Sequence, residues 1–209
     1  MNKKILISIM NDLAKDRPVF YSEADFQHAL AWKIREKYGN VTIRLEKGVG
    51  DDQYIDIVIG NGEIYIELKY KTCKLTKDDT GVVVQGECFG LKNQGAQDNS
   101  KYDFWKDVER VQASENGGYA IFLTNDHLYW GSDNEGYSAE EFAINEGREM
   151  CNVKKMAWNL KNGKTKKGKR NKCIEINLKD PLKWETYKNL EGGYDNEVFK
   201  YLLVDSPPK

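Results

Sequence analysis

The sequence predicts a mixed α/β (α+β) protein whose helices pack on one central sheet. An amphipathic helical pattern over residues 22–38 precedes three segments rich in Ile, Val and Tyr, all within residues 41–70. A second amphipathic helix over residues 102–114 leads into a buried strand at residues 119–124. The order α-β-β-β-α-β is typical of one domain in which helices cover a sheet.

The composition indicates a soluble protein of the reducing cytoplasm. Hydrophobic residues make up 40% of the 209-residue chain and charged residues 31%, and the formal net charge is -1. No apolar run approaches the length of a membrane span, and the short run at residues 5–10 lacks the cleavage site of a signal peptide. The four cysteines show no metal-ligand spacing. We therefore expect free thiols, no membrane partner and a cytoplasmic location.

Two helices are predicted before the first strand. Residues 5–15 have the pattern of a short helix that ends before a proline. Ser22 is a typical N-cap for the second helix, with Asp25 three positions later, and Gly39 is a typical end. The alternating segment at residues 41–47 follows as the first strand.

Two strands joined by a tight turn are the segment around which we expect the rest of the chain to be organised. Residues 54–59 and 63–70 are rich in Ile, Val and Tyr, and two glycines lie in the turn between them. Glu67 and Lys69 are two positions apart, so their side chains point to the same face of the second strand. The alternating apolar residues point to the other face, which is the candidate core.

A carboxylate interrupts the first of these two strands. Asp56 lies in an otherwise apolar run, and it meets Glu67 and Lys69 if the strands pair. Two neighbouring carboxylates are costly unless a cation lies between them, and Mg²⁺ binds through one or two carboxylates while it keeps several waters. Lys69 would then hold or activate a nucleophile beside a phosphate. The alternative is an ordinary amphipathic hairpin with a surface salt bridge.

Asp56, Glu67 and Lys69 on consecutive strands resemble the signature of the PD-(D/E)-x-K nuclease superfamily. The resemblance covers about residues 23–124, roughly half of the chain, and Ile55 stands where the signature has its proline. It implies a restriction-endonuclease-like core and a Mg²⁺-dependent nuclease, with Mn²⁺ as a substitute, that hydrolyses phosphodiester bonds of DNA. The implied role is an endonuclease of restriction, repair, recombination or phage defence. Asp56 and Glu67 would bind the metal, and Lys69 would orient the attacking water.

Two other classes of function stay open from the sequence alone. One is a catalytically inactive module that keeps the same fold and binds nucleic acid. The other is a structural or partner-binding α/β protein whose hairpin charges are incidental. The presence of Asp56, Glu67 and Lys69 together favours the enzyme over the inactive module. A salt bridge from Asp56 to a neighbour, far from any cleft, would favour the structural role.

Glu23 is a fourth candidate for the catalytic and metal site. It lies at the edge of the apolar stripe of the predicted helix at residues 22–38, on the same side as Gln27 and Leu30. Many members of the resembled family have such a Glu on the helix before the sheet, which implies an acidic group aimed at the metal. The alternative is a first-turn Glu that the helix dipole favours.

The predicted helix at residues 102–114 has a polar side as well as an apolar one. Asp98 or Ser100 is a candidate N-cap for it. Asp103, Asp107 and Arg110 are polar and could approach the cleft. The alternative, which we expect, is an exposed face with an Asp107–Arg110 ion pair that contributes little stability.

Positive charge is concentrated in residues 161–172, between predicted paired strands at residues 153–160 and 173–178. This segment holds seven of the 32 Lys and Arg residues and no acid, which leaves 25 basic against 33 acidic residues elsewhere. A basic hairpin tip suits sequence-independent contact with phosphates, and a solubilising loop is the alternative. The predicted nucleic-acid contacts are Lys71, Lys74, Lys164, Lys166, Lys167, Lys169 and Arg170.

The chain is predicted to be a single domain, residues 1–209, with a core at about residues 20–125 and a β-rich C-terminal extension at residues 126–209. In the extension, residues 181–189 have the pattern of a helix or turn, and residues 197–204 that of a last strand. No repeat or linker divides the chain. Restriction-type nucleases are often dimers, so the resemblance allows a homodimer, although no segment specifies a dimer face.

Overall fold

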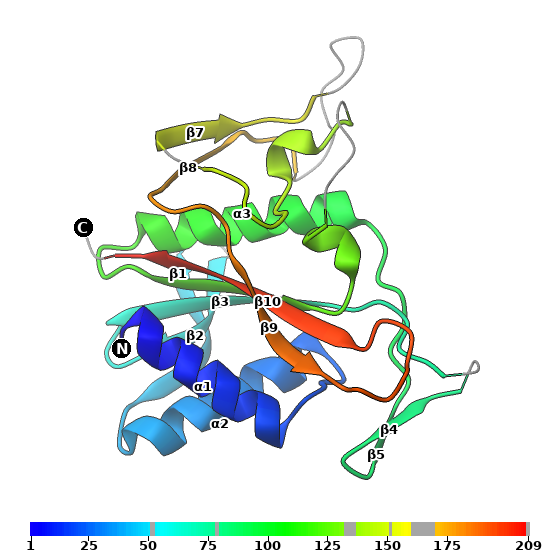
Figure 1. The fold of residues 1–209 in the computed structure, drawn as a ribbon. Helices are drawn as coiled ribbons and strands as arrows, with labels where there is room; N and C mark the ends of the chain where they lie inside the picture. Colours follow the sequence, from blue (N-terminus) through cyan, green and yellow to red (C-terminus); the bar gives the residue numbers. More distant parts are fainter. Residues whose placement is uncertain (51–52, 78–79, 132–136, 151, 160–169, 208–209) are drawn as a thin grey trace.

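The computed structural model describes residues 1–50, 53–77, 80–131, 137–150, 152–159 and 170–207. In this part of the chain lie three α-helices, two short 3-10 helices and ten strands (Figure 1). In chain order they are α1 (Lys3–Asp16), α2 (Glu23–Tyr38), β1 (Ile43–Gly50), β2 (Gln53–Ile59), β3 (Ile64–Lys71), β4 (Val82–Val84), β5 (Glu87–Phe89), α3 (Gln97–Ala113), β6 (Gly118–Thr124), η1 (His127–Tyr129), η2 (Glu140–Phe142), β7 (Asn152–Met156), β8 (Ile174–Leu178), β9 (Trp184–Asn189) and β10 (Val198–Ser206).

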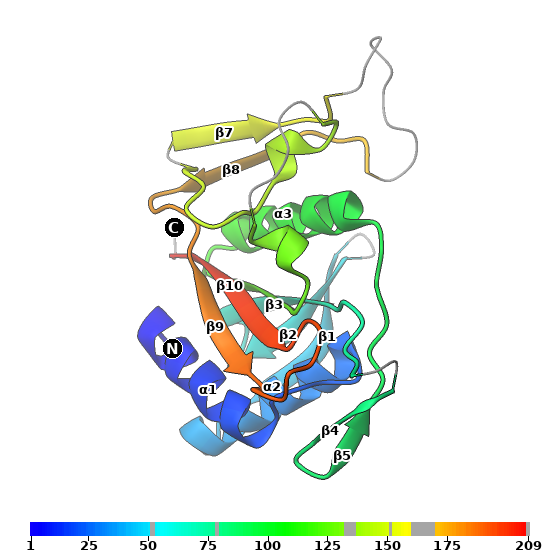
Figure 2. The same ribbon diagram turned by 45° about the vertical axis from the view of Figure 1, so that its right-hand side comes forward.

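A six-stranded mixed sheet forms the centre of the molecule, in the order β1-β2-β3-β6-β10-β9. Only the β3–β6 pair is parallel, and the other neighbours in this sheet are antiparallel. Helices α1 and α2 cover one face, and α3 covers the other, with the β7–β8 hairpin packed beyond α3 (Figures 1 and 2). The prediction of a mixed α+β protein with a central sheet is confirmed.

The sheet separates two apolar cores, and β6 contributes to both because its side chains alternate. Ile121 and Leu123 pack with α1 and α2, whereas Ala120 and Phe122 pack with α3, β7 and β8. Every residue of β6 is buried, as expected for a central strand with a layer on each face. Among the described residues, none of the helices has the length and apolar character needed to span a membrane.

The start of α2 is fixed by the predicted cap. The Ser22 hydroxyl accepts a hydrogen bond from the Asp25 amide at 3.1 Å, and the Asp25 carboxylate pairs with Arg17 at 2.8 Å. The helix ends at Gly39, whose φ of 66° is the left-handed conformation that glycine tolerates best. These contacts make Glu23 the first residue of α2, with its side chain over β3.

Two predictions about element boundaries are wrong. Helix α3 starts at Gln97, and neither Asp98 nor Ser100 caps it, because the preceding residue is Ala96 in a left-handed conformation. Residues 181–189 contain strand β9 in place of a helix or turn. The register of β9 shifts between its partners Phe199 and Lys200, and such a bulge turns the two-residue alternation into a three-residue spacing that resembles a helix.

Two smaller hairpins are present, and one of them, β7–β8, was predicted from residues 153–160 and 173–178. β4 pairs with β5, and β7 pairs with β8, all antiparallel. The β4–β5 hairpin is tied to the start of α2, because the Tyr21 ring stacks on Phe89 at 4.6 Å between centroids. Residues 160–169, which include most of the predicted basic segment, lie outside the described residues.

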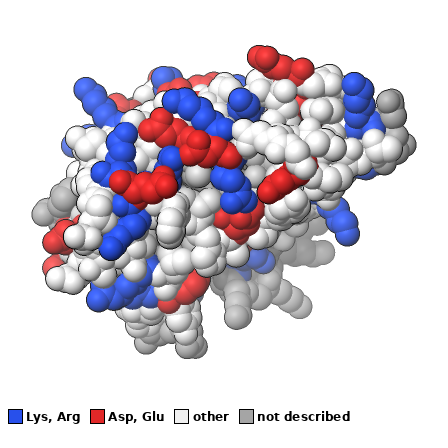
Figure 3. All heavy atoms as spheres, turned by 90° about the horizontal axis from the view of Figure 1, so that it is seen from below, with Lys and Arg blue, Asp and Glu red and all other residues white. Residues whose placement is uncertain are grey.

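Basic and acidic side chains alternate over the face formed by α1 and α2 (Figure 3). Lys33 pairs with Asp16 and Glu36, and Asp12 pairs with Lys15. A phosphate backbone is attracted by a surface of one sign. This face therefore does not offer the basic field that a nucleic acid needs.

Replacement of Phe122 by Ala should destabilise the protein by about 3–5 kcal/mol, because it leaves a cavity in the core under α3. Phe122 is fully buried and packs on Phe104, Tyr129 and Trp184. Urea unfolding followed by circular dichroism measures the loss. The control is V153A on the exposed side of β7, with a change of at most about 0.5 kcal/mol. Equal losses in the two variants would contradict the assigned core.

Candidate active site

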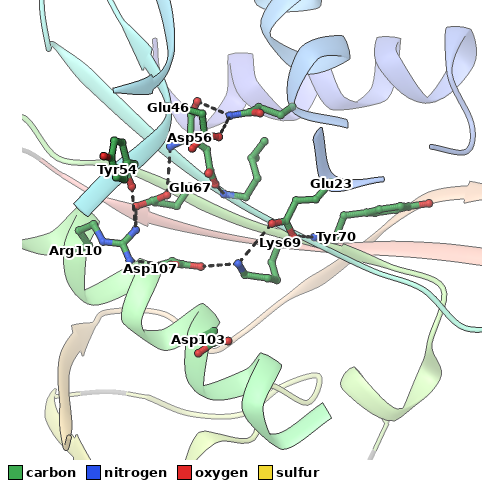
Figure 4. A network of polar contacts seen from close by, with 12 residues as sticks. Glu23, Glu46, Tyr54, Asp56, Glu67, Lys69, Tyr70, Asp103, Asp107 and Arg110 are labelled. Carbon is green, nitrogen blue, oxygen red and sulfur yellow. Dashed lines mark hydrogen bonds and ion pairs between the residues drawn. The ribbon is translucent and has the colours of Figure 1, made fainter. Parts of the chain in front are cut away.

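The candidate site lies where β2 and β3 separate. The pairing of β2 with β3 ends at Ile57 opposite Ile66. Beyond that point β2 stays paired with β1, and β3 stays paired with β6. Beyond this point, two carboxylates accept hydrogen bonds from backbone amides that have no β2–β3 pairing partner. Asp56 Oδ2 accepts a hydrogen bond from the Leu68 amide at 2.6 Å, and Glu67 Oε2 accepts one from the Asp56 amide at 3.4 Å (Figure 4). We call this separation of β2 and β3, beyond Ile57 and Ile66, the fork. It places the two predicted metal ligands, Asp56 and Glu67, beside each other.

Helix α2 adds Glu23 to this fork. Glu23 Oε2 accepts a hydrogen bond from the Tyr70 amide at 2.7 Å, and its other oxygen lies 3.7 Å from Lys69 Nζ. Lys69 also lies 3.5 Å from Asp107 Oδ2. The structure thus brings together all four residues predicted for the catalytic centre, Glu23, Asp56, Glu67 and Lys69, from three elements (Figure 4).

Two residues of α3 also belong to the site, although the sequence suggested an exposed pair. Arg110 forms a direct ion pair with Glu67, and its other terminal nitrogen lies 3.3 Å from Asp107 Oδ1. Arg110 also lies 3.5 Å from the Tyr54 carbonyl oxygen. The Asp107–Arg110 pair exists as predicted, but its exposure was predicted wrongly, because Asp107 is only 8% exposed.

The spacing of polar residues along α3 gave a weak indication that Asp107 and Arg110 face the sheet. Asp103, Asp107 and Arg110 lie four and three positions apart, so they form one stripe along α3. The helix packs on β3 with this stripe, and Asp107 and Arg110 face the sheet. Asp103, at the other end of the stripe, pairs with Arg170 at 2.6 Å.

Gln27 anchors the backbone of Asp56. Its side-chain amide donates to the Asp56 carbonyl oxygen and to Glu46 Oε1, both at 2.7 Å. Glu46 lies in β1 with a φ of 49°, an uncommon backbone conformation for a residue with a side chain. The sequence placed Gln27 on the stripe of α2 but did not reveal this role, which depends on the contact between α2 and the β1–β2 pair.

The pKa values of three carboxylates, those of half-buried Asp56 and of buried Glu67 and Asp107, are raised above the ordinary range. Burial raises the pKa of Asp56, and the hydrogen bond from Leu68 opposes it. Burial, followed by the charge of Asp107, raises the pKa of Glu67 against the opposing charge of Arg110. Burial likewise raises the pKa of Asp107. The ionised site is therefore electrostatically unfavourable as it stands.

Lys69 stays protonated at neutral pH. Burial alone would lower its pKa, but the charges of Asp107, Glu23 and Asp56 outweigh burial and raise the pKa above its ordinary value. A general base needs a pKa near the working pH. The arrangement therefore suits Lys69 to orient or neutralise an oxygen and does not suit it to accept a proton.

The donor set fits a hard divalent cation in composition. Glu23, Asp56, Glu67 and Asp107 carry four negative charges when ionised, against two positive charges on Lys69 and Arg110. Glu46 adds a further negative charge that acts on Asp56. The ionised site therefore has an excess of negative charge, which favours a hard divalent cation. Among the described residues, no three His, Cys, Asp or Glu side chains are gathered as they stand into a ligand group. The carboxylates point at amides and at basic side chains, so metal binding requires them to turn.

One buried oxygen in this network has no hydrogen bond. Asp107 Oδ2 is buried and lacks a hydrogen-bond partner, although Lys69 lies within ion-pair distance. A buried carboxylate oxygen without a hydrogen bond is costly, and an ordered water or a bound ion is a usual partner for such an atom.

The site opens to solvent on the side of Glu23 and is closed at Glu67. The Glu67 side chain is 2% exposed, whereas that of Glu23 is 41% exposed. A cavity of about 570 Å³ lies elsewhere, beside the end of β10, and none of the charged site residues lines it. The fork is therefore a partly open surface site.

The predicted nucleic-acid contacts are only partly described. Lys164, Lys166, Lys167 and Lys169 lie outside the described residues. Lys71 is half-buried at the end of β3, and Lys74 is exposed just beyond it. Arg170 pairs with Asp103, one helical turn from Asp107. The described end of the basic segment is therefore linked by an ion pair to the same helix that lines the site.

No protein-family model, no curated protein and no solved structure matches the chain. The function must therefore be argued from the charged side chains that β2, β3, α2 and α3 bring to the fork, and from their geometry.

Proposed function

We propose that the chain is a divalent-metal-dependent nuclease that hydrolyses phosphodiester bonds of DNA. The observation that carries the proposal is the convergence of Glu23, Asp56, Glu67 and Lys69 at the fork of β2 and β3. The chain order of α2, three strands, α3 and β6 supports the proposal, since a restriction-endonuclease-like core would have its elements in that order. The short β4–β5 hairpin lies between β3 and α3 as an insertion.

Each site residue has a separate role in this proposal. Asp56 and Glu67 would hold Mg²⁺ or Mn²⁺, with Glu23 as a further ligand and the Leu68 carbonyl nearby. The bound ion would polarise the phosphate and lower the pKa of a water. Lys69 remains charged, so it positions the attacking oxygen and stabilises the negative charge that develops on the phosphate.

The nucleic acid would approach from the open side of Glu23. Lys71 and Lys74 continue from the end of β3, and Arg170 holds the end of the basic segment against α3. These groups would contact phosphates, and affinity would then fall steeply with salt. The face of α1 and α2 is unsuited to this role because its charges are mixed.

A catalytically inactive nucleic-acid-binding module is the second candidate, and one observation favours it. Arg110 covers Glu67, which keeps that carboxylate paired with a basic side chain. A purely structural hairpin is less well supported, because Asp56 bonds to the Leu68 amide and takes part in none of the ion pairs found among the described residues. Cleavage and metal titration separate the first two candidates.

Replacement of Lys69 by Ala should lower the cleavage rate by at least about 100-fold, the usual cost of losing one group that stabilises transition-state charge. DNA binding should persist. The assay is a panel of single-stranded, double-stranded and branched DNA with Mg²⁺ or Mn²⁺, and D56A is tested beside it. The control is K33A, since Lys33 also pairs with two carboxylates and has a nearly equal exposed fraction, 21% against 19%. A K69A protein that cuts like the wild type would refute the assignment.

Replacement of Asp56 by Asn should raise the melting temperature of the metal-free protein and remove its stabilisation by Mn²⁺. Burial raises the pKa of Asp56 in the folded state. A carboxyl with a raised folded pKa contributes stability at low pH that is lost as pH rises through that pKa, so at neutral pH the charged form opposes folding. The amide oxygen of Asn still accepts from Leu68. Differential scanning fluorimetry at pH 7.5 with and without Mn²⁺ measures both effects.

D12N is the matched control for this measurement. Asp12 lies on the exposed side of α1, and its hydrogen bond with Lys15 lowers its pKa. The substitution should therefore not raise the melting temperature, and stabilisation by Mn²⁺ should be the same as in the wild type. If D56N keeps the full stabilisation by Mn²⁺, Asp56 is not a metal ligand.

A further inference from the structure

We infer that Arg110 of α3 is a built-in competitor of the metal, which holds Glu67 in the metal-free protein and must leave it before a divalent ion binds. The inference rests on the proposed function, since it concerns the same carboxylates. It assigns to α3 a role that the four sequence-predicted residues do not include.

The contacts of Arg110 place its charge on the least exposed carboxylate of the site. It forms a direct ion pair with Glu67, and its second terminal nitrogen lies 3.3 Å from Asp107 Oδ1. The guanidinium therefore bridges a carboxylate of β3 and a carboxylate of α3 (Figure 4). A planar fork of N–H donors is well suited to hold two carboxylates in this way.

Asp107 provides an independent sign that the arrangement is incomplete. Its Oδ2 atom is buried without a hydrogen-bond partner, while Oδ1 faces Arg110. The residue is 8% exposed, and Lys69 lies 3.5 Å from Oδ2. Asp107 thus holds both basic side chains of the site and keeps one oxygen aimed at the fork. It can retain Arg110 after Glu67 is released.

Movement of Arg110 requires only its side chain. Its side chain is 27% exposed, so it has a route toward solvent. The helix backbone is held in place by Phe104, Val108 and Val111, which are buried. Release of Glu67 would free one of its carboxylate oxygens for the metal and would increase the distance between that oxygen and the positive charge of Arg110. Both effects predict that loss of Arg110 strengthens metal binding.

The test is a Mn²⁺ and Mg²⁺ titration of the full chain by isothermal calorimetry and by thermal shift at pH 7.5. R110Q should bind at least about fivefold more tightly than the wild type, the lower end of usual coupling between two ligands of one site. It should also have a lower melting temperature without metal, because Glu67 loses its partner. R170Q is the matched control, since Arg170 forms an ion pair with Asp103 on the same helix outside the fork.

The outcomes separate the two proposals. If the wild type binds metal and R110Q binds no more tightly, the competition by Arg110 is refuted while the nuclease proposal stands. If only R110Q binds metal, the competition is supported in its strongest form. If neither protein binds metal, both proposals fail. Should R110Q not fold, R110K replaces it, because Lys cannot bridge both carboxylates; affinity equal to the wild type would then overturn the inference.

Discussion

The separation of β2 from β3 after Ile57 and Ile66 is the constraint on which the rest of the site depends. At this fork the regular ladder stops, and the carboxylates of Asp56 and Glu67 take backbone amides in its place. Backbone donors that lose a ladder partner must find another acceptor. Acidic side chains therefore lie at the middle of the sheet, where burial of their charges is unfavourable in free energy.

Helices α2 and α3, which flank the fork, contribute the charged side chains that contact the residues of β2 and β3. Ser22 starts α2 at a point that brings Glu23 to Tyr70 and Lys69. On the opposite face, α3 brings Arg110 and Asp107. The two apolar cores hold these helices on the sheet, so the geometry of the charges is set by packing that is remote from them.

The local part of this arrangement was predictable from the sequence, and the tertiary part was not. Glu67 and Lys69 share a face because a strand has a period of two, and Ser22 caps a helix through contacts within one turn. The inward position of Asp107 depends on the rotation of α3 about its axis, which distant packing sets. Strand β9 was missed for a related reason, since its bulge arises only when it pairs with β10.

The direction of the pKa shifts sets this network apart from the ion pairs at the surface of the protein. At the surface, the hydrogen bond from Lys15 lowers the pKa of Asp12, so the charged form is favoured by folding. At the fork, burial raises the pKa of Asp56, Glu67 and Asp107 although Lys69 and Arg110 are close. Burial of these carboxylates outweighs the charges of the two basic side chains, and the ionised site retains an electrostatic cost that a divalent cation would relieve. Clustered groups with pKa values shifted against their neighbours' charges are typical of functional sites.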